Sequence, residues 1–489
     1  MSPSRILVRV AVAGAALAAS AQLAMVAYTM AARSRLPVDI DWLESGQMYQ
    51  AYRLLHGQTL YVDRVDGFVP YPYPPGHPAL LALIGSVFGV DYGPARSLSA
   101  FAFVVLMFVL GTQLRAHVGG RTRGLVLGAV GAAFAACTYP LLEGYYDLAR
   151  VDTLAATLAV VGAAFVAGPN PPRARLVGAS LFFTTAVYTK QTMVFLVGAV
   201  VIAVLARDRR RGLQLGGLVF AESALLLAVL SWSTHGMFLR WILDLRHHPL
   251  EWRRGLDGAI WFGLRIPWLI AIVPLAIVAR VRRVLSYRTV TWLALLCGAL
   301  PAAALPFAKE GGWINNFIPL FAPAGTVALM LVVDLTRPRR ALALSSLYGA
   351  CAIALAFLWT DQQRLRPSLE DVARAQALSS SIRELQGSVL CPISPMMALR
   401  NGHADDQAPW LAYFDATRAG IGAPHEYGQW IERTRPDWIL LIDGDTVLDQ
   451  VEDTANYEFD RELDTPEVGR IPLLYVVPHR LYRRIRLPR

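Results

Sequence analysis

Long apolar stretches, separated by short polar segments, occupy the first 360 positions of the chain. Most have roughly the 17–25 residues that an α-helix needs to cross about 30 Å of hydrocarbon. The pattern therefore predicts a polytopic α-helical membrane protein with about 11 transmembrane helices. The spans are expected at about residues 10–32, 95–114, 123–142, 152–168, 174–189, 193–206, 213–234, 258–279, 289–307, 315–333 and 341–360.

The first apolar run admits two interpretations. It follows Arg5 and Arg9, and Ala19-Ser20-Ala21 resembles the cleavage site of a secretory signal. The run extends to about residue 32, however, which is longer than the core of a usual signal peptide. We therefore expect a first span that the mature protein keeps.

Polar or proline-rich positions interrupt the apolar pattern at two places. A single helix over 174–206 would bury Lys190 in hydrocarbon at a cost of about 2.5–3.5 kcal/mol. We expect instead a hairpin of two helices with Lys190 at its outer turn. Residues 77–90 are apolar but short, and prolines precede or open them. This segment is expected to lie as a helix in the outer interface.

The arginine clusters in the short loops between spans fall on one side of this arrangement. By the positive-inside rule that side is the cytoplasm, and it also holds the N-terminus. The residues concerned are Arg5, Arg9, Arg115, Arg121, Arg123, Arg173, Arg175, Arg207, Arg209, Arg210, Arg211, Arg280, Arg282, Arg283, Arg288, Arg337, Arg339 and Arg340. The outer side of this inner or plasma membrane protein then receives 33–94, here called the first outer loop, with 143–151, 235–257 and 308–314.

The remainder of the chain, after residue 360, is polar and is expected on the same outer side. Ser368–Leu385 has a helical pattern, and Ser388–Ile393, Trp438–Ile442 and Leu473–Val477 have the pattern of strands. The chain is thus predicted to divide into a transmembrane domain, 1–360, and a small extracytoplasmic α/β domain, 361–489.

The composition of the chain argues against several classes of function. Hydrophobic residues make up 55% of the chain and charged residues 17%, against about 25% charged in soluble domains. The net charge of +10 comes from arginines that orient helices, so nucleic acid is not an expected partner. The four cysteines form no CxxC pair, which argues against disulfides or zinc. His247 and His248, with Glu251, are expected in a solvated loop, and no metal site is predicted.

Three carboxylates open the first outer loop, directly after the first span: Asp39, Asp41 and Glu44. Asp41 and Glu44 are three positions apart, so on a helix they would share one face. They can equally be an ordinary helix start, because acidic residues stabilise the first turn. The pattern alone leaves a functional and a structural interpretation open.

Further charges gather at the outer ends of other spans. Asp152 is either a cap of the fourth span or part of a polar site, and Arg150 has no capping role. Lys190 and Lys309 are the two lysines of the chain, and both lie on the outer side, as Arg96 does. These four cations, Arg96, Arg150, Lys190 and Lys309, are candidates for binding an anionic ligand.

Charged groups near lipid depth are costly and tend to mark function. Carboxylates beside cations suit the transfer of a group from a lipid phosphate. The departing phosphate needs positive charge, and an acceptor hydroxyl needs a base. Transport of lipid-linked sugars is an alternative, although the mid-span positions are almost all apolar. A non-catalytic envelope assembly or sensor protein is a third, and it leaves the acids of the first outer loop unexplained.

The order of several short motifs resembles the C-type (GT-C) membrane glycosyltransferases, which use polyprenyl-phosphate sugars. Protein O-mannosyltransferases and lipid A aminoarabinose transferases are examples. The resemblance is carried by Asp41-Trp-Leu-Glu44, Ala51-Tyr-Arg-Leu-Leu-His-Gly57, Leu60-Tyr61, Tyr71-Pro-Tyr-Pro-Pro75, Val87-Phe88-Gly89, Arg96, Arg150-Val-Asp152 and Thr189-Lys190-Gln191-Thr192. It covers the first span to about residue 200 best, and the C-terminal part resembles the outer domains of many members.

The resemblance implies transfer of a sugar from a polyprenyl-phosphate donor to an extracytoplasmic glycan, lipid or protein. It implies that Asp41 is the catalytic base. In the common pattern the two acids are adjacent, whereas two residues separate them here, so Glu44 remains the alternative base. Other residues expected in the site are Asp39, Asp152, Tyr71, Tyr73 and His77. No cofactor is required by this chemistry, and a divalent cation bridging the acids is compatible with it.

Overall fold

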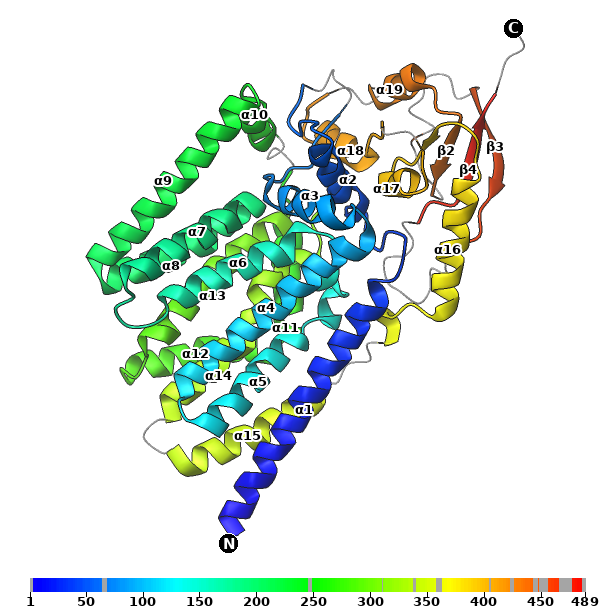
Figure 1. The fold of residues 1–489 in the computed structure, drawn as a ribbon. Coiled ribbons are helices and arrows are strands. Elements are labelled where there is room, and N and C mark those ends of the chain that lie inside the picture. Colours follow the sequence, from blue (N-terminus) through cyan, green and yellow to red (C-terminus); the bar gives the residue numbers. More distant parts are fainter. Residues whose placement is uncertain are drawn as a thin grey trace.

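The structure, a computed structural model, describes residues 3–63, 68–244, 249–309, 311–336, 340–357, 363–403, 406–422, 426–442, 447, 456–465 and 477–485. In the part described before residue 360, the regular elements are helices (Figure 1). The α-helices are α1 (Pro3–Arg33), α2 (Glu44–Leu55), α3 (Gly76–Phe88), α4 (Tyr92–Val118), α5 (Arg121–Ala136), α6 (Val151–Val166), α7 (Arg173–Thr189), α8 (Val194–Arg207), α9 (Arg209–Ser233), α10 (Met237–Asp244), α11 (Trp252–Arg265), α12 (Pro267–Val281), α13 (Tyr287–Phe307), α14 (Ile318–Thr336) and α15 (Arg340–Phe357). Short 3-10 turns are η2 (Pro140–Leu142), η3 (Tyr145–Asp147), η4 (Gln191–Met193) and η6 (Ile314–Phe317).

Several of these helices have the length and composition of membrane spans. Within the described residues, six are long and apolar enough to cross a bilayer, or seven if the bent pair α11–α12 is one span. The helices α6 and α8, and the described part of α15, are apolar but shorter. The structure thus supports a multi-pass protein, while the expected count of 11 spans stays a prediction.

The hairpin expected around Lys190 is present. Helix α7 ends at Thr189, Lys190 has an extended backbone, and η4 leads directly into α8. Residues 76–88 form the short helix α3, as expected for the segment beyond the Pro-rich stretch.

The span expected at 258–279 is not one straight helix. The chain bends by 86° between α11 and α12. Proline explains the break, because Pro267 lacks an N–H and disfavours the helical conformation at Ile266, whose φ and ψ are −118° and 85°. The residues that were assigned to one span therefore form two elements of different direction.

Close helix packing builds the apolar core. Helix α4 packs against α5 and α6, α6 against α7, and α1 against α5 and α15. Gly111 of α4 and Gly128 of α5 face each other so closely that a Cβ on either would lie 2.8 Å from the other's carbonyl oxygen. Small residues at such crossings let two backbones approach, as in membrane helices generally.

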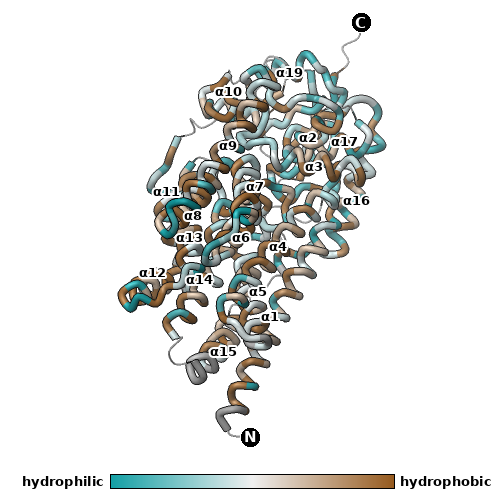
Figure 2. Tube along the Cα trace, turned by 60° about the vertical axis from the view of Figure 1, so that its left-hand side comes forward, coloured by the Kyte–Doolittle hydropathy of each residue, from teal (hydrophilic) through white to brown (hydrophobic). Residues whose placement is uncertain are grey.

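Hydrophobic residues also cover the outside of the helices, which suits contact with lipid. Phe101, Phe108 and Phe220 are about two-thirds to three-quarters exposed. Figure 2 shows hydrophobic stretches along the long helices and hydrophilic ones concentrated at the end that carries α17 and α19. One end of the helical bundle is therefore the polar end, where the first outer loop lies.

The C-terminal part combines helices with a small sheet. Its elements are η8 (Gln363–Leu365), α16 (Leu369–Arg383), β1 (Val389–Leu390), α17 (Pro395–Leu399), α18 (Trp410–Arg418), α19 (Glu426–Thr434), β2 (Trp438–Leu441), β3 (Tyr457–Glu462) and β4 (Arg480–Arg484). The order in the sheet is β1-β2-β4-β3, with β1 and β2 parallel and the other pairs antiparallel. Ser368 caps α16 through a capping box with Asp371.

The expected helix and the strand at 438–442 thus correspond to α16 and β2, and the strand at 388–393 is shortened to β1. The strand expected at 473–477 lies outside the described residues except for Val477. Strands β3 and β4 were not expected. Both are rich in charged residues, which hides the strand pattern.

The C-terminal part packs directly on the first outer loop. The Met396 N–H donates to Ser45 Oγ at 3.2 Å, and Arg400 Nη1 donates to the Pro37 carbonyl at 2.7 Å. A shared apolar cluster joins Leu60 and Tyr71 to Trp410 and other residues of the C-terminal part. The division of the chain at residue 360 stays a prediction, but the two parts are in contact where the acids lie.

Candidate functional site

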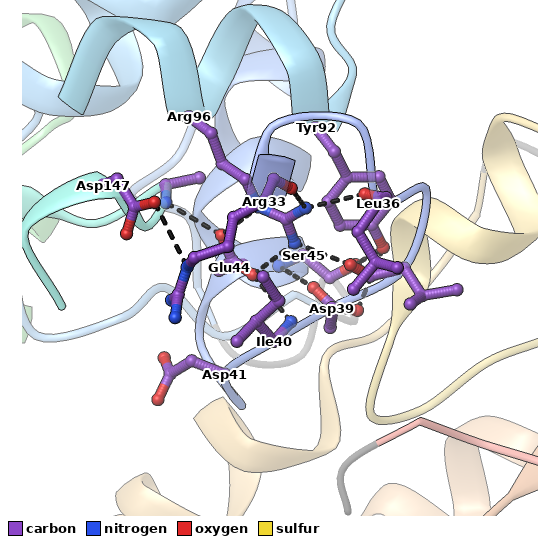
Figure 3. Close-up of polar contacts among 12 residues, drawn as sticks. Arg33, Leu36, Asp39, Ile40, Asp41, Glu44, Ser45, Tyr92, Arg96 and Asp147 are labelled. Carbon is purple, nitrogen blue, oxygen red and sulfur yellow. Dashed lines mark hydrogen bonds and ion pairs between the residues drawn. The ribbon is translucent and has the colours of Figure 1, made fainter. Parts of the chain in front are cut away.

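Glu44 and Arg96 form a buried ion pair at the base of the first outer loop (Figure 3). Arg96 Nε donates to Glu44 Oε1 at 2.9 Å, and Nη2 donates to Oε2 at 2.7 Å. The two side chains are 0–1% exposed. We call this pair the clasp.

Backbone groups supply the remaining hydrogen-bond partners of both side chains of the clasp. Glu44 also accepts from two backbone N–H groups, those of Ile40 at 2.8 Å and Ala149 at 2.9 Å. Arg96 donates to three carbonyls, of Arg33 at 3.1 Å, Leu36 at 2.6 Å and Val38 at 2.6 Å. The clasp therefore fixes the path of the chain from α1 into α2, and its polar atoms already have partners.

Two further acids lie in the same region. Asp147 pairs with Arg33 at the end of α1, with 3.2 Å between Oδ2 and Nε. Asp39 accepts from the Ser45 N–H at 2.8 Å and from the Tyr92 hydroxyl at 3.0 Å. Burial, and then the charge of Glu44, raises the pKa of Asp39 to about 7. Asp39 is thus a buried carboxyl that takes up a proton near neutral pH.

Asp41 points away from this group (Figure 3) and has a different set of partners. Its carboxylate pairs with Arg150 and accepts from the Tyr145 hydroxyl at 2.8 Å. Arg150 Nε donates to Asp152 Oδ2 at 3.2 Å, and Lys190 Nζ donates to Asp152 Oδ1 at 2.6 Å. Asp41, Arg150, Asp152 and Lys190 thus form a continuous series of contacts, which we call the ion-pair chain.

Three separate segments supply the ion-pair chain, and a fourth supplies a further partner of Lys190. Asp41 comes from the first outer loop, and Arg150 and Asp152 come from the N-cap and first turn of α6. Lys190 lies at the turn between α7 and α8 and also donates to Asn316 Oδ1 of η6 at 2.7 Å. Residues as far apart in sequence as 41 and 316 therefore meet at the polar end. The side chains of the four charged residues are 1–8% exposed.

The aromatic and Pro-rich stretch of the first outer loop lies next to the ion-pair chain. Tyr71 is buried against α2, where a Cβ at Gly46 would lie 2.1 Å from the ring. The charges of Asp41 and Arg150 act on Tyr71, and those of Arg150 and Asp152 act on Tyr73. Burial raises the pKa of both phenols, so both keep their hydroxyl proton.

His77 lies in the first turn of α3 and is fully buried. A Cβ at Gly76 would lie 2.6 Å from the Tyr188 carbonyl oxygen, so this turn packs tightly against the end of α7. Burial lowers the pKa of His77 to about 4, while the charge of Asp152 opposes that shift. The imidazole is therefore neutral at neutral pH and lies near the ion-pair chain.

Lys309 is not part of the ion-pair chain. Its backbone pairs with Leu250 in an isolated bridge, and burial lowers the pKa of its amino group. Sequence analysis did not identify Tyr145, Asn316 or Asp415 as site residues. Asp415 of α18 acts electrostatically on Tyr71 and Tyr73, and burial raises its pKa to about 7. A hydroxyl, an amide or a lone acid carries no sequence signal of its role until its partners are known.

Two cavities are lined by residues that lie close in sequence to residues of the ion-pair chain or to their partners. An apolar one of about 460 Å³ lies among α7, α8, α9 and α10, and its lining includes Pro74, Tyr188 and Gln191, next to Lys190. A larger one of about 1050 Å³ lies beside α11 and combines aromatic and charged residues. Its lining includes Glu143 and Trp313, which precede Tyr145 and Asn316 by two and three positions.

The described residues contain no group of three or more His, Cys, Asp or Glu side chains that could hold a metal ion. In the ion-pair chain, each carboxylate already contacts a cation of the protein. His247 and His248 lie outside the described residues. The metal requirement of the chain stays a prediction.

Comparison with known proteins gives a fold and no family assignment. No known protein family and no curated protein matches the sequence. Among solved structures, ArnT from Cupriavidus metallidurans is similar, both bound to undecaprenyl phosphate and in the apo state. Each ArnT structure has a TM-score of 0.58 and 12% identity, over 95% of this chain and 97% of ArnT. The apo oligosaccharyltransferase of Archaeoglobus fulgidus has a TM-score of 0.49 and 12% identity, over 86% of this chain and 69% of that one. The protein therefore has the membrane fold of ArnT along nearly its whole length.

Proposed function

We propose that the protein is a membrane glycosyltransferase that moves a sugar from a polyprenyl-phosphate donor to an extracytoplasmic acceptor. The observation that carries the proposal is the ion-pair chain, in which a buried carboxylate and two cations meet beside an apolar cavity. Such charges are costly to bury and are typical of functional sites. The fold shared with ArnT, which has been crystallised with undecaprenyl phosphate, supports the same chemistry.

In this proposal Asp41 is the general base. It takes the proton of the acceptor hydroxyl while the hydroxyl oxygen forms a bond to the anomeric carbon of the donor sugar. The bond from that carbon to the phosphate oxygen breaks, and polyprenyl phosphate leaves with the bonding electrons. Positive charge placed where the leaving group gains negative charge stabilises the transition state, which is the role of Arg150 and Lys190.

Glu44 and Arg96 have a structural role in this proposal. Both are saturated by hydrogen bonds within the protein, and replacing those bonds by a ligand would leave buried backbone groups without partners. Glu44 is the alternative base if Asp41 can be replaced without loss of transferase activity. Lys309 lies outside the ion-pair chain and is not assigned to the donor phosphate.

The two cavities suit the two substrates. The apolar cavity beside Gln191 would receive the first isoprene units of the donor, because its lining is almost entirely hydrophobic. The cavity beside α11 would receive the acceptor, because it combines tryptophans with charged side chains and so suits a ligand with polar groups on an apolar framework. The substrates would then meet at the ion-pair chain.

The orientation in the membrane is part of the proposal. The arginine pattern predicts a cytoplasmic N-terminus and an outer site. Single cysteines that replace Arg210 and Gly402, in a variant without the native cysteines, should react with a membrane-impermeant reagent from the cytoplasmic and outer side respectively. Labelling of both from one side would contradict the proposed orientation.

The direct test uses the full chain purified in detergent. Undecaprenyl phosphate carrying a radiolabelled sugar, from a panel of sugars, is incubated with the protein and with host envelope membranes as the source of acceptor. Transfer of label into the membrane fraction, with release of undecaprenyl phosphate, supports the proposal. Absence of transfer, together with absence of binding of undecaprenyl phosphate, would overturn it.

A further inference from the structure

The imidazole of His77 is buried without hydrogen bonds. Its exposed fraction is 0%, and neither ring nitrogen has a partner among the described residues. Buried polar groups in proteins nearly always have a partner, and leaving one unpaired costs about 1–3 kcal/mol. A fold that keeps such a group beside an ion-pair chain maintains it at a cost in stability.

The other buried histidines give the contrast. His117 lies against Asp334 at 3.1 Å and the Met330 carbonyl at 3.3 Å. Both nitrogens of His403 contact backbone carbonyls, of Gly387 at 3.1 Å and Ile382 at 2.6 Å. Among the buried histidines that the structure describes, those two have partners within the protein, and the ring of His77 has none.

His77 lies near the ion-pair chain, and three other residues with unpaired polar atoms lie near it in space or sequence. The charges of Asp152 and Arg150 both act on its ring. The hydroxyl oxygens of Tyr71 and Thr153 and the side-chain oxygen of Gln191 are also buried without a partner among the described residues. Thr153 follows Asp152 and Gln191 follows Lys190. The unpaired atoms thus belong to the segments that form the ion-pair chain.

The chemistry of these atoms indicates the class of ligand. A neutral imidazole offers one donor and one acceptor, and burial keeps His77 neutral by lowering its pKa to about 4. Tyrosine and threonine hydroxyls likewise donate and accept. A phosphate diester offers only acceptors, so it would pair with the donors of these groups and leave their acceptors unpaired. Sugar hydroxyls both donate and accept, so they would pair with the donors and with the acceptors.

We propose that His77, with the Tyr71 hydroxyl, forms the subsite that binds the hydroxyl groups of the donor sugar, and that it determines which sugar is accepted. The inference rests on the proposed function, because the sugar reaches this subsite as part of a polyprenyl-phosphate donor. Arg150 and Lys190 hold the phosphate, and His77 contacts the sugar beside it. His77 is therefore a binding and specificity residue and takes no proton in the reaction.

The test measures the affinity of the full-length protein in detergent for undecaprenyl phosphate and for its glucosyl, mannosyl and arabinosyl derivatives. The preference is the ratio of the affinity for a glycosylated lipid to the affinity for the sugar-free lipid. His77→Phe fills the same space without hydrogen bonds, and we expect it to reduce the preference for the best glycosylated lipid about 10- to 100-fold, as for one or two hydrogen bonds. Affinity for sugar-free undecaprenyl phosphate should change less than about twofold, well below the tenfold that 1.4 kcal/mol represents. His77→Gln keeps a donor and an acceptor and should retain part of the preference.

Thermal unfolding separates a binding role from a structural one. His77→Phe removes an unpaired imidazole, so its melting temperature should equal or exceed that of the wild type. The matched control, His403→Phe, removes a hydrogen-bonded imidazole whose partners are in the C-terminal part. It should lower the melting temperature without changing the sugar preference.

Three outcomes would overturn the inference: an unchanged preference in His77→Phe, an equal loss of affinity for the sugar-free lipid, or no preference for any glycosylated lipid in the wild type. Failure of the proposed function is distinguishable, because then the wild type would not bind undecaprenyl phosphate in any form.

Discussion

The clasp and the ion-pair chain contain the same types of residue at the same end of the molecule, yet they differ in one respect. In the clasp, Glu44 and Arg96 have backbone partners for the bonds that they do not make to each other. In the ion-pair chain the two cations instead bond to side chains: Arg150 to Asp41 and Asp152, and Lys190 to Asp152 and Asn316. A buried cation bonded to the backbone fixes the path of the chain, whereas one bonded to side chains can exchange those partners for a ligand.

Asp41→Asn should give the largest effect on activity. The change keeps the shape of the side chain and removes the basic site. General-base catalysis typically contributes about 10²–10⁴-fold, so turnover should fall by that factor while binding of undecaprenyl phosphate persists. Steady-state transfer rates and lipid binding, measured on the same preparation, check this.

Glu44→Gln is the matched comparison for the base. If turnover is abolished in a folded Glu44→Gln protein and retained in Asp41→Asn, the base is Glu44. Full activity of both variants with a verified donor would contradict the proposed mechanism.

Breaking the clasp should act on stability. Arg96→Ala leaves the Glu44 carboxylate buried without its cation, and removal of one partner of a buried ion pair costs about 3–5 kcal/mol. Unfolding followed in detergent should show this loss. The exposed pair of Arg483 and Glu458 is the control, since solvent screens this pair and Glu458→Gln should leave the stability nearly unchanged. Loss of donor binding without loss of stability in Arg96→Ala would instead return Arg96 to the phosphate site.

The two lysines sharpen the comparison further. Lys190→Ala should weaken binding of undecaprenyl phosphate roughly 10- to 150-fold, the equivalent of a charge-assisted hydrogen bond of about 1.5–3 kcal/mol. Asp152 keeps Arg150 as a partner, so the variant should fold. Lys309→Ala should leave the affinity unchanged. Equal losses in both variants would contradict the assignment of Lys190 to the phosphate.

The last prediction concerns the dependence of stability on pH. Burial raises the pKa of Asp39 to about 7, so the folded protein holds a proton that the unfolded chain releases near the ordinary aspartate pKa of 3.8. The stabilisation from this proton is complete below the unfolded pKa and is lost as the pH rises through the folded one. Asp39→Asn should therefore flatten the fall in melting temperature between about pH 4 and pH 7. An identical pH profile for variant and wild type would show that Asp39 does not titrate in this range.

Much of the helical part could be predicted from the sequence because the apolar length of each segment is a local property. The helices α4, α6, α7, α13 and α14 lie within a few residues of their expected spans. The bend before Pro267 was missed although proline signals it, because the apolar pattern continues on both sides. The strands β3 and β4 were missed because charged side chains alternate with few apolar ones on a partly exposed sheet.

The candidate residues of the site could be identified from the sequence, but not their pairing. Asp41 and Arg150 are 109 positions apart, and Lys190 and Asn316 are 126 apart. A sequence shows which charges lie near the membrane surface and gives no local signal of which acid meets which base. Arg96 is kept apart from the ion-pair chain because it donates to three backbone carbonyls. Every residue has such a carbonyl, so the sequence does not indicate which ones Arg96 contacts.

The hydrogen bond from the Met396 N–H to Ser45 joins a segment that is synthesised early to one that is synthesised late. These residues are separated by 351 positions, and ribosomes add roughly 5–20 residues per second. The first outer loop would therefore be synthesised roughly 20–70 s before its last partner appears. During that interval the helices can insert one after another while Ser45, which is bonded to Asp39 and Tyr92 in the finished protein, lacks the contact from α17. A nascent chain, or one truncated before α17, would accordingly insert into the bilayer while its first outer loop still lacks the contact with α17.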